Sequence, residues 1–172
     1  MRLLFDLDKK DYDKCTRSFV RDSARSIIIK NGKIAMVHSL KYDYYKFPGG
    51  GIESGETPES AMIRETLEEA GLIVIAESIK EYGYVHRAQK SAKNETEYFL
   101  QNNFYYLCDA QDAVAEQKLD DYESDEKFTL EYVSPEVAIA TNRSGDHGPK
   151  DKLMLEREAK VLEMLIDEGY FT

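Results

Sequence analysis

The chain has few cysteines, no long apolar run and a shortage of positive charge. Its two cysteines, Cys15 and Cys108, are too few for a disulfide framework or a cysteine-rich zinc site, which favours a reducing, cytoplasmic location. The first residues lack the apolar segment of a signal peptide, and no stretch approaches the ~18 apolar residues of a membrane helix. We therefore expect no membrane partner.

The shortage of positive charge excludes a further class of partner. The chain has 23 basic and 33 acidic residues, which gives a net charge of −10. Proteins that bind nucleic-acid polymers gain affinity from Lys and Arg against phosphate, so we expect no such polymer. A small phosphorylated ligand remains compatible with the charge, because a bound metal ion can reverse the field of a site.

Length and composition predict one domain over residues 1–172. An apolar content of 42% suffices for one hydrophobic core in a chain of this length. We expect an N-terminal extension over 1–22 and a terminal helix over about 151–168, and we interpret the acidic segment 109–126 as a solvated loop or short helix. Apolar runs predict strands at Leu3–Leu7, Arg25–Lys30, Lys33–Ser39, Leu72–Ala76, Tyr82–His86, Tyr98–Leu107 and Phe128–Val133, with Asn31-Gly32 as a hairpin turn. This irregular order predicts an α/β fold with a mixed sheet.

One helix is marked at both ends. Thr57 followed by Pro58 predicts an N-cap and a first helical residue, and Gly71 predicts a left-handed C-cap after Ala70. At 100° per residue, the apolar core face comprises Ile63, Leu67 and Ala70.

Three glutamates gather on the opposite side of that helix. Glu65, Glu68 and Glu69 are spaced i, i+3 and i+4, and each close pair of like charges destabilises an isolated helix by roughly 0.2–0.5 kcal/mol. A solvated acidic face is one interpretation. The glycine-rich turn 49–51 favours a metal site instead, because carboxylate and carbonyl oxygens are the ligands of hard divalent cations.

The spacing of these residues resembles a known signature. Gly50, Glu56 and the run Arg64-Glu65-Thr66-Leu67-Glu68-Glu69-Ala70-Gly71-Leu72 are similar to the Nudix box, over residues 50–72. The one departure is Thr66, where an aliphatic residue is usual. The hairpin 27–39 and the entry 47–50 also look like those of MutT-type Nudix hydrolases.

The resemblance implies an α/β/α sandwich and an enzymatic activity. That activity is Mg²⁺-dependent hydrolysis of a nucleoside diphosphate linked to another moiety, by attack of a metal-activated water on phosphorus, and Mn²⁺ can substitute for Mg²⁺. A nucleoside triphosphate or a modified (oxidised) nucleotide is favoured as the small-molecule substrate. The alternative is a non-catalytic Nudix-like nucleotide sensor or interaction domain, which an intact set of box carboxylates disfavours. A homodimer through the N-terminal strand and tyrosine-rich hairpins remains an open expectation.

The resemblance also assigns roles to single residues. Glu65, Glu68 and Glu69 are implied to hold the metal ion together with the Gly49 carbonyl, with Glu65 favoured as general base and Glu68 as a pure ligand. Arg64 is implied to orient the glutamates, and Glu56 and Gly50 to support them. Glu97 and Asp109 are candidates for one further acidic ligand outside the box.

Four more residues are candidates for substrate binding. Tyr45 and Phe47 are placed to stack on a base, although packing in the core is the competing interpretation for Phe47. His38 is a candidate phosphate contact or a structural histidine. Asn142 is a candidate for reading a purine edge or for shaping a loop.

Overall fold

Helices flank a set of twisted β-sheets, and the structure, a computed structural model, describes residues 1–172. The helices are α1 (Pro58–Ala70), α2 (Asp121–Asp125), α3 (Pro135–Arg143), α4 (Lys152–Asp167) and the 3₁₀ helix η1 (Ala76–Ser78). The strands are β1 (Leu3–Asp8), β2 (Arg17–Val20), β3 (Ser23–Ile27), β4 (Ile29–Lys30), β5 (Lys33–Ser39), β6 (Tyr44–Lys46), β7 (Gly49–Gly51), β8 (Leu72–Val74), β9 (Lys80–Lys90), β10 (Glu97–Leu107), β11 (Ala110–Val114) and β12 (Phe128–Val133). The predicted mixed α/β class is confirmed.

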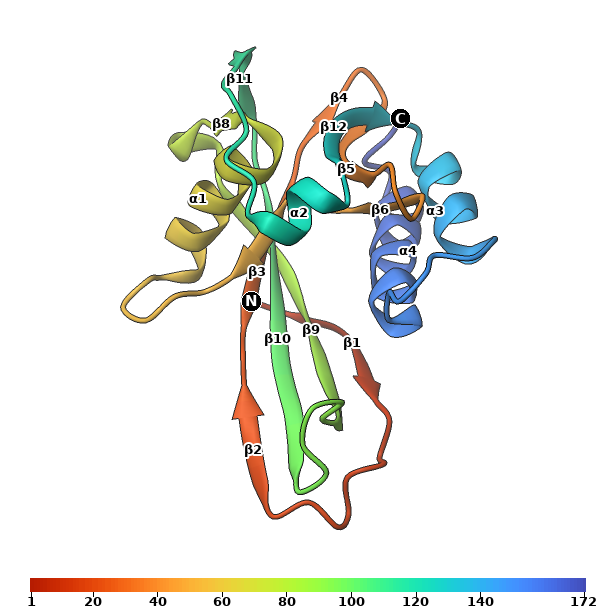
Figure 1. Ribbon diagram of the computed structural model, residues 1–172. Helices are drawn as coiled ribbons and strands as arrows, with labels where there is room; N and C mark the ends of the chain where they lie inside the picture. The colour runs from red at the N-terminus through yellow and green to blue at the C-terminus, as the bar shows by residue number, and fades with distance from the viewer.

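The main sheet runs in the order β1-β9-β10-β3-β7, with β2 also on β10. Both β2 and β3 pair parallel to β10 in one register, from Arg17 opposite Glu97 to Ile27 opposite Leu107. The two strands therefore act as one interrupted strand, although the sequence predicted only its second half. The β9–β10 hairpin projects beyond the helices, with β1 along one side and β2 along the other (Figure 1).

A second sheet has the order β12-β5-β4, with β6 on β5. The hairpin turn at Asn31-Gly32 is confirmed, because these residues have φ of 52° and 71° between β4 and β5. The strand predicted over residues 25–30 is wrong in one respect. It divides near Ile28, because β3 pairs in the main sheet and β4 in the second.

The helix caps of α1 are confirmed, but its buried face is not the predicted one. Thr57 accepts a hydrogen bond from the Ser60 amide, and Gly71 takes a left-handed φ of 69°. The buried residues are Ala61, Met62, Thr66, Glu69 and Ala70, whereas Ile63 and Leu67 are only partly buried. The helix is thus turned so that a glutamate, and not only apolar side chains, faces inward.

The segment 109–126 is also less solvated than expected. It contains β11 and α2, and the side chains of Glu123 and Glu126 are buried. The terminal helix is confirmed as α4, which Asp151 caps and whose apolar stripe includes the fully buried Leu162. No helix in the structure is long and apolar enough to cross a bilayer.

Candidate active site

The glycine turn of β7 passes directly beside a carboxylate of α1. A Cβ on Gly50 would lie 2.5 Å from the Glu65 carboxylate, so any larger residue would push that group away. Gly49 has a φ of 150°, and a Cβ there would collide with the Ala24 carbonyl of the neighbouring strand. Two glycines are therefore required by close approach, which brings the Gly49 carbonyl and Glu65 to one place.

Three carboxylates converge at this turn. Oxygens of Glu65, Glu69 and Glu123 all lie within 4.8 Å of one another. Glu65 and Glu69 come from α1, whereas Glu123 comes from α2, and Glu69 and Glu123 are buried. An ion that binds oxygen at about 2.0–2.6 Å holds ligands up to about 5 Å apart, so this donor set fits a hard divalent cation.

A lysine ammonium binds two of the oxygens at this turn. Lys46 Nζ donates to Glu69 Oε1 at 2.5 Å and to the Gly49 carbonyl at 3.2 Å. The other oxygen of Glu69 accepts from the Gly49 amide at 3.1 Å. Glu69 and the Gly49 carbonyl thus already coordinate a positive charge, which shows that their geometry suits a cation.

Arg64 ties the remaining carboxylates together. Its guanidinium binds both oxygens of Glu56, at 2.7 and 2.9 Å, and donates to Glu65 at 2.7 Å, to Glu68 at 3.3 Å and to the Gly51 carbonyl at 3.1 Å. The bidentate bond to Arg64 lowers the pKa of Glu56 to about 2. One arginine therefore fixes the turn and α1 relative to each other.

Two of the clustered carboxylates, Glu65 and Glu123, resist ionisation. Burial raises the pKa of Glu65, and the hydrogen bond from Arg64 opposes that shift. Burial raises the pKa of Glu123 to about 7, and the charges of Glu69 and Asp120 add to the effect. Three carboxylates this close are stable in their ionised form only when a cation offsets their mutual repulsion.

Comparison with known proteins decides the family. A sequence model of the NUDIX domain matches residues 20–156, well over half of the chain. The chain belongs to the Nudix family. A NUDIX hydrolase from Nitrosomonas europaea has the same fold, with a TM-score of 0.61 and 17% identity over 88% of this chain and 89% of that one.

Two further proteins give the range of similarity. A structure of MutT, from work on Aliivibrio salmonicida and Vibrio cholerae, has a TM-score of 0.55 and 19% identity over 87% of this chain and 99% of that one. An RNA pyrophosphohydrolase from Baumannia cicadellinicola is 50% identical over 42 residues, which are 24% of this chain and 26% of that protein. The match thus spans about a quarter of that curated relative.

The unusual Thr66 of this Nudix box has a structural explanation. Its side chain is fully buried, and its hydroxyl donates to Ser26 Oγ at 2.9 Å. Ser26 Oγ in turn donates to the Pro48 carbonyl at 3.4 Å. The hydroxyl therefore links α1 through β3 to the glycine turn, which an aliphatic residue could not do.

The predicted acidic ligands do not all meet. Glu68 lies outside the three-carboxylate cluster and is bonded to Arg64, so its role as a ligand stays a prediction. Glu97 begins β10 and pairs with Arg17 at 3.4 Å. Asp109 follows the other end of β10, where its amide donates to Ser78. Neither Glu97 nor Asp109 joins the cluster, and Glu123 takes the place that the sequence analysis gave to them.

The four candidate substrate-binding residues make contacts within the protein, and their contact with a substrate stays a prediction. Phe47 is fully buried and packs edge-on against Tyr105, which matches the competing interpretation that it belongs to the core. Asn142 is also buried, because its amide bonds both the N–H and the carbonyl of Tyr45. The Tyr45 ring stacks on His38, and both side chains bind Glu131. These contacts fasten β6 to its neighbours, and none of the four lines the cavity beside the glycine turn.

Two site residues escaped the sequence analysis although each had a signal. Glu123 stands three residues after Asp120, and together they form a capping box that predicts the start of α2. Lys46 lies two residues before Pro48 in the turn entry. The sequence also contains a signal for the interrupted strand β2–β3. Residues 17, 19, 21, 23 and 25 are Arg, Phe, Arg, Ser and Arg, a period-two series that is typical of one face of a strand.

Proposed function

We propose that this Nudix protein is a divalent-metal-dependent pyrophosphohydrolase that cleaves nucleoside diphosphates linked to another moiety. The convergence of Glu65, Glu69 and Glu123 beside the Gly49 carbonyl carries this proposal. Mg²⁺ is the proposed ion, since oxygen donors suit it and it leaves coordination positions for substrate phosphates. A nucleoside triphosphate, ordinary or oxidised, is the favoured substrate.

Each residue has a role that follows from its position. Glu65, Glu69, Glu123 and the Gly49 carbonyl would hold the ion, which when bound activates water and offsets the negative charge of phosphate. Arg64 keeps Glu65 directed at the glycine turn through its hydrogen bond at 2.7 Å. Glu65 is the proposed general base, because it is the least buried of the three and lies closest to Gly50.

The test is a screen of nucleoside diphosphate derivatives with Mg²⁺, with the products identified by mass. We expect release of phosphate or pyrophosphate by the wild type and its loss in Glu65→Gln. Glu59→Gln is the matched control, because Glu59 is an exposed glutamate in the first turn of the same helix. Equal turnover by wild type and Glu65→Gln would contradict the proposal. A tight ligand that is not hydrolysed would instead indicate a nucleotide sensor.

A further inference from the structure

The carboxylate of Glu123 comes to the cluster from α2, a helix that is too short to hold its own position. It has five residues, far below the ~12–15 that an isolated helix needs in water. No strand or other helix packs broadly against it. The Glu123 carboxylate accepts a hydrogen bond from the Asp120 amide at 2.9 Å, which fixes the start of the helix but not its place in the fold. Contacts from outside α2 must therefore determine where Glu123 lies.

The chain that leads into α2 is fastened to α1. The Lys118 amide donates to the Glu68 carbonyl at 2.8 Å, and the Gln117 side chain donates to the Glu69 carbonyl. These bonds hold the chain at the end of α1, two residues before Asp120 caps the next helix. They leave the other end of α2 to be held by different contacts.

The end of α2 is held by a buried ion pair. Glu126, the C-cap of α2, is 6% exposed, and its carboxylate binds the Lys150 ammonium at 2.7 Å. The second carboxylate oxygen accepts from the Tyr44 hydroxyl at 2.5 Å and from Ser39 Oγ at 3.3 Å. Lys150 is the only cation that pairs with Glu126. Loss of this lysine would leave a buried charge uncompensated, which is costly.

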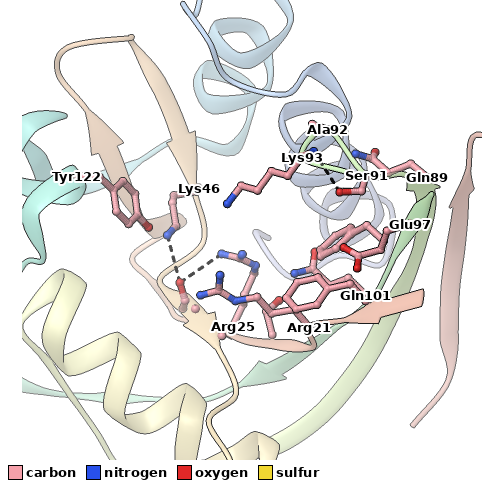
Figure 2. A pocket seen from close by; sticks show the side chains of 16 residues that line it. Arg21, Arg25, Lys46, Gln89, Ser91, Ala92, Lys93, Glu97, Gln101 and Tyr122 are labelled. Atoms are coloured by element: carbon pink, nitrogen blue, oxygen red, sulfur yellow. Dashed lines mark hydrogen bonds between the residues drawn. The ribbon is translucent and has the colours of Figure 1, made fainter. Parts of the chain in front are cut away.

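The same ammonium also lies over two aromatic rings. Lys150 Nζ is 5.2 Å from the centre of the Tyr44 ring and 5.4 Å from that of Tyr122, distances at which a ring attracts a cation. Tyr122 directly precedes Glu123, and it lines the cavity of about 630 Å³ beside the glycine turn (Figure 2). Lys150 therefore contacts α2 on both sides of Glu123, at Tyr122 and at Glu126.

Lys150 belongs to the loop between α3 and α4, which is itself fixed to the fold. His147 Nδ1 donates to the Tyr42 carbonyl at 3.0 Å. Gly148 has a φ of 61° and lies so close to the Tyr42 ring that a Cβ would be 2.5 Å from it. Pro149 restricts the backbone directly before Lys150. The loop thus brings Lys150 to α2 from a fixed point beside Tyr42.

We propose that Lys150 is a positioning residue for the metal site, which acts by keeping α2 where the Glu123 carboxylate can bind the ion. The loop between α3 and α4 thereby supports a ligand that lies on another element. This inference rests on the proposed function, because it needs the ion that Glu65, Glu69 and Glu123 are proposed to hold.

The sign of the effect distinguishes positioning from simple electrostatics. Removal of a nearby positive charge by itself strengthens the binding of a cation, because it removes repulsion. Loss of a group that orients a metal ligand has the opposite effect and typically costs about 10–100-fold in metal affinity. Weaker metal binding in a variant that has lost a lysine therefore identifies a positioning effect.

The test is the affinity of the full chain for Mn²⁺, measured by paramagnetic resonance. Lys150→Met should weaken Mn²⁺ binding about tenfold. Lys152→Met is the matched control, because Lys152 is an exposed lysine at the start of α4, and this variant should not weaken binding. Lys150→Arg keeps a cation that can bind Glu126 and the two rings, so its affinity should stay within about threefold of the wild type.

A double-variant cycle tests whether the effect passes through Glu123. In a Glu123→Gln background, Lys150→Met should change Mn²⁺ affinity less than about twofold, because the ligand that it positions is already lost. Glu126→Gln breaks the same ion pair from its other side, and its amide oxygen can still accept from Tyr44 and Ser39. It should show the same dependence on Glu123, and it replaces Lys150→Met if that variant does not fold.

The possible outcomes separate this inference from the proposed function. The inference alone is overturned if the wild type binds Mn²⁺ but Lys150→Met behaves like Lys152→Met. It is likewise overturned if the full loss persists in the Glu123→Gln background, because Lys150 would then act elsewhere. A wild type that binds no Mn²⁺ at millimolar concentration would overturn the proposed function as well.

Discussion

The site has two halves: a carboxylate half, formed by Glu65, Glu69 and Glu123, and a cationic half, which is the cavity beside the glycine turn. The two halves differ in charge and in how the chain forms them. The carboxylate half comes mainly from one turn and the helix after it, where Gly49 and Glu69 are only twenty residues apart. The cationic half comes from β2 and β3 laid against β10, where paired residues are 80 positions apart. The carboxylate half can therefore be recognised from the spacing of nearby residues, whereas the cationic half depends on which strands pair.

The comparison also changes what the net charge means. A net charge of −10 describes the whole chain, but it does not describe the cavity beside the glycine turn. Arg21, Arg25, Lys46 and Lys93 line that cavity with a single carboxylate, Glu97, although Lys46 and Arg25 also pair with the buried Glu69 and Glu158. An acidic protein can therefore carry a cationic surface directly beside a cluster of carboxylates.

The largest effect should come from the buried charges that support the cationic half. Glu158→Gln leaves Arg25 and Arg157 without a carboxylate, so we expect a loss of about 3–5 kcal/mol in the free energy of unfolding. Glu163→Gln on the same helix breaks an exposed pair with Arg143 and should cost at most about 1 kcal/mol. Urea denaturation measures both free energies of unfolding. Equal losses would show that Arg25 and Arg157 do not depend on the Glu158 carboxylate.

The next largest effect should come from the carboxylate half. Gly50→Ala places a Cβ against the Glu65 carboxylate, so we expect turnover to fall about a hundredfold, as for a displacement of about 1 Å. Gly51→Ala should lose much less, because its Cβ meets only the flexible end of Arg21. Steady-state kinetics on a substrate from the screen measures the difference. A Gly50→Ala enzyme with normal kcat would contradict the close approach.

A third prediction concerns the residue shared by both halves. Lys46→Met removes the ammonium that Glu69 and the Gly49 carbonyl now bind, so Mn²⁺ should bind about tenfold more tightly. The metal-free variant should be less stable, because Glu69 loses its buried partner. A Mn²⁺ titration followed by paramagnetic resonance, together with thermal denaturation, tests both statements. Unchanged affinity would mean that Lys46 does not compete with the ion.

The smallest effect should come from the unusual residue of the Nudix box. Thr66→Val keeps the shape but loses the hydrogen bond to Ser26, so we expect a loss of about 1 kcal/mol in stability. Turnover should stay within twofold or so, since Ser26 retains its contact with Pro48. Thermal denaturation beside kinetics separates the two quantities, and a large fall in kcat would assign Thr66 a more direct role.

The features that the sequence predicted are those that depend on near neighbours. Thr57, Pro58 and Gly71 mark α1 because caps act within one turn, and Asn31-Gly32 marks its hairpin for the same reason. Apolar patterning also indicated the mixed α/β class and α4.

The features that it missed depend on distant partners. Glu123 was interpreted as part of a solvated segment, because its sequence neighbours do not reveal that it is buried beside Glu65 and Glu69 of α1. Phe47 and Asn142 were candidates for substrate binding or for a structural role, and the sequence left both open. Packing on Tyr105 buries Phe47, and hydrogen bonds to Tyr45 hold Asn142 in the interior. Side-chain chemistry narrows the roles of a residue, whereas tertiary packing decides whether a ligand can reach it.

The interrupted strand formed by β2 and β3 also has a consequence for the order of folding during synthesis. Its partner β10 follows 80 residues later, so at about 5–20 residues per second the strand waits roughly 4–16 s for β10 to be made. By then the ribosome has already released the glycine turn and α1, whose contacts are largely local. The Nudix box can therefore take shape early, whereas the surface formed by β2 and β3 is completed only after β10 has been made.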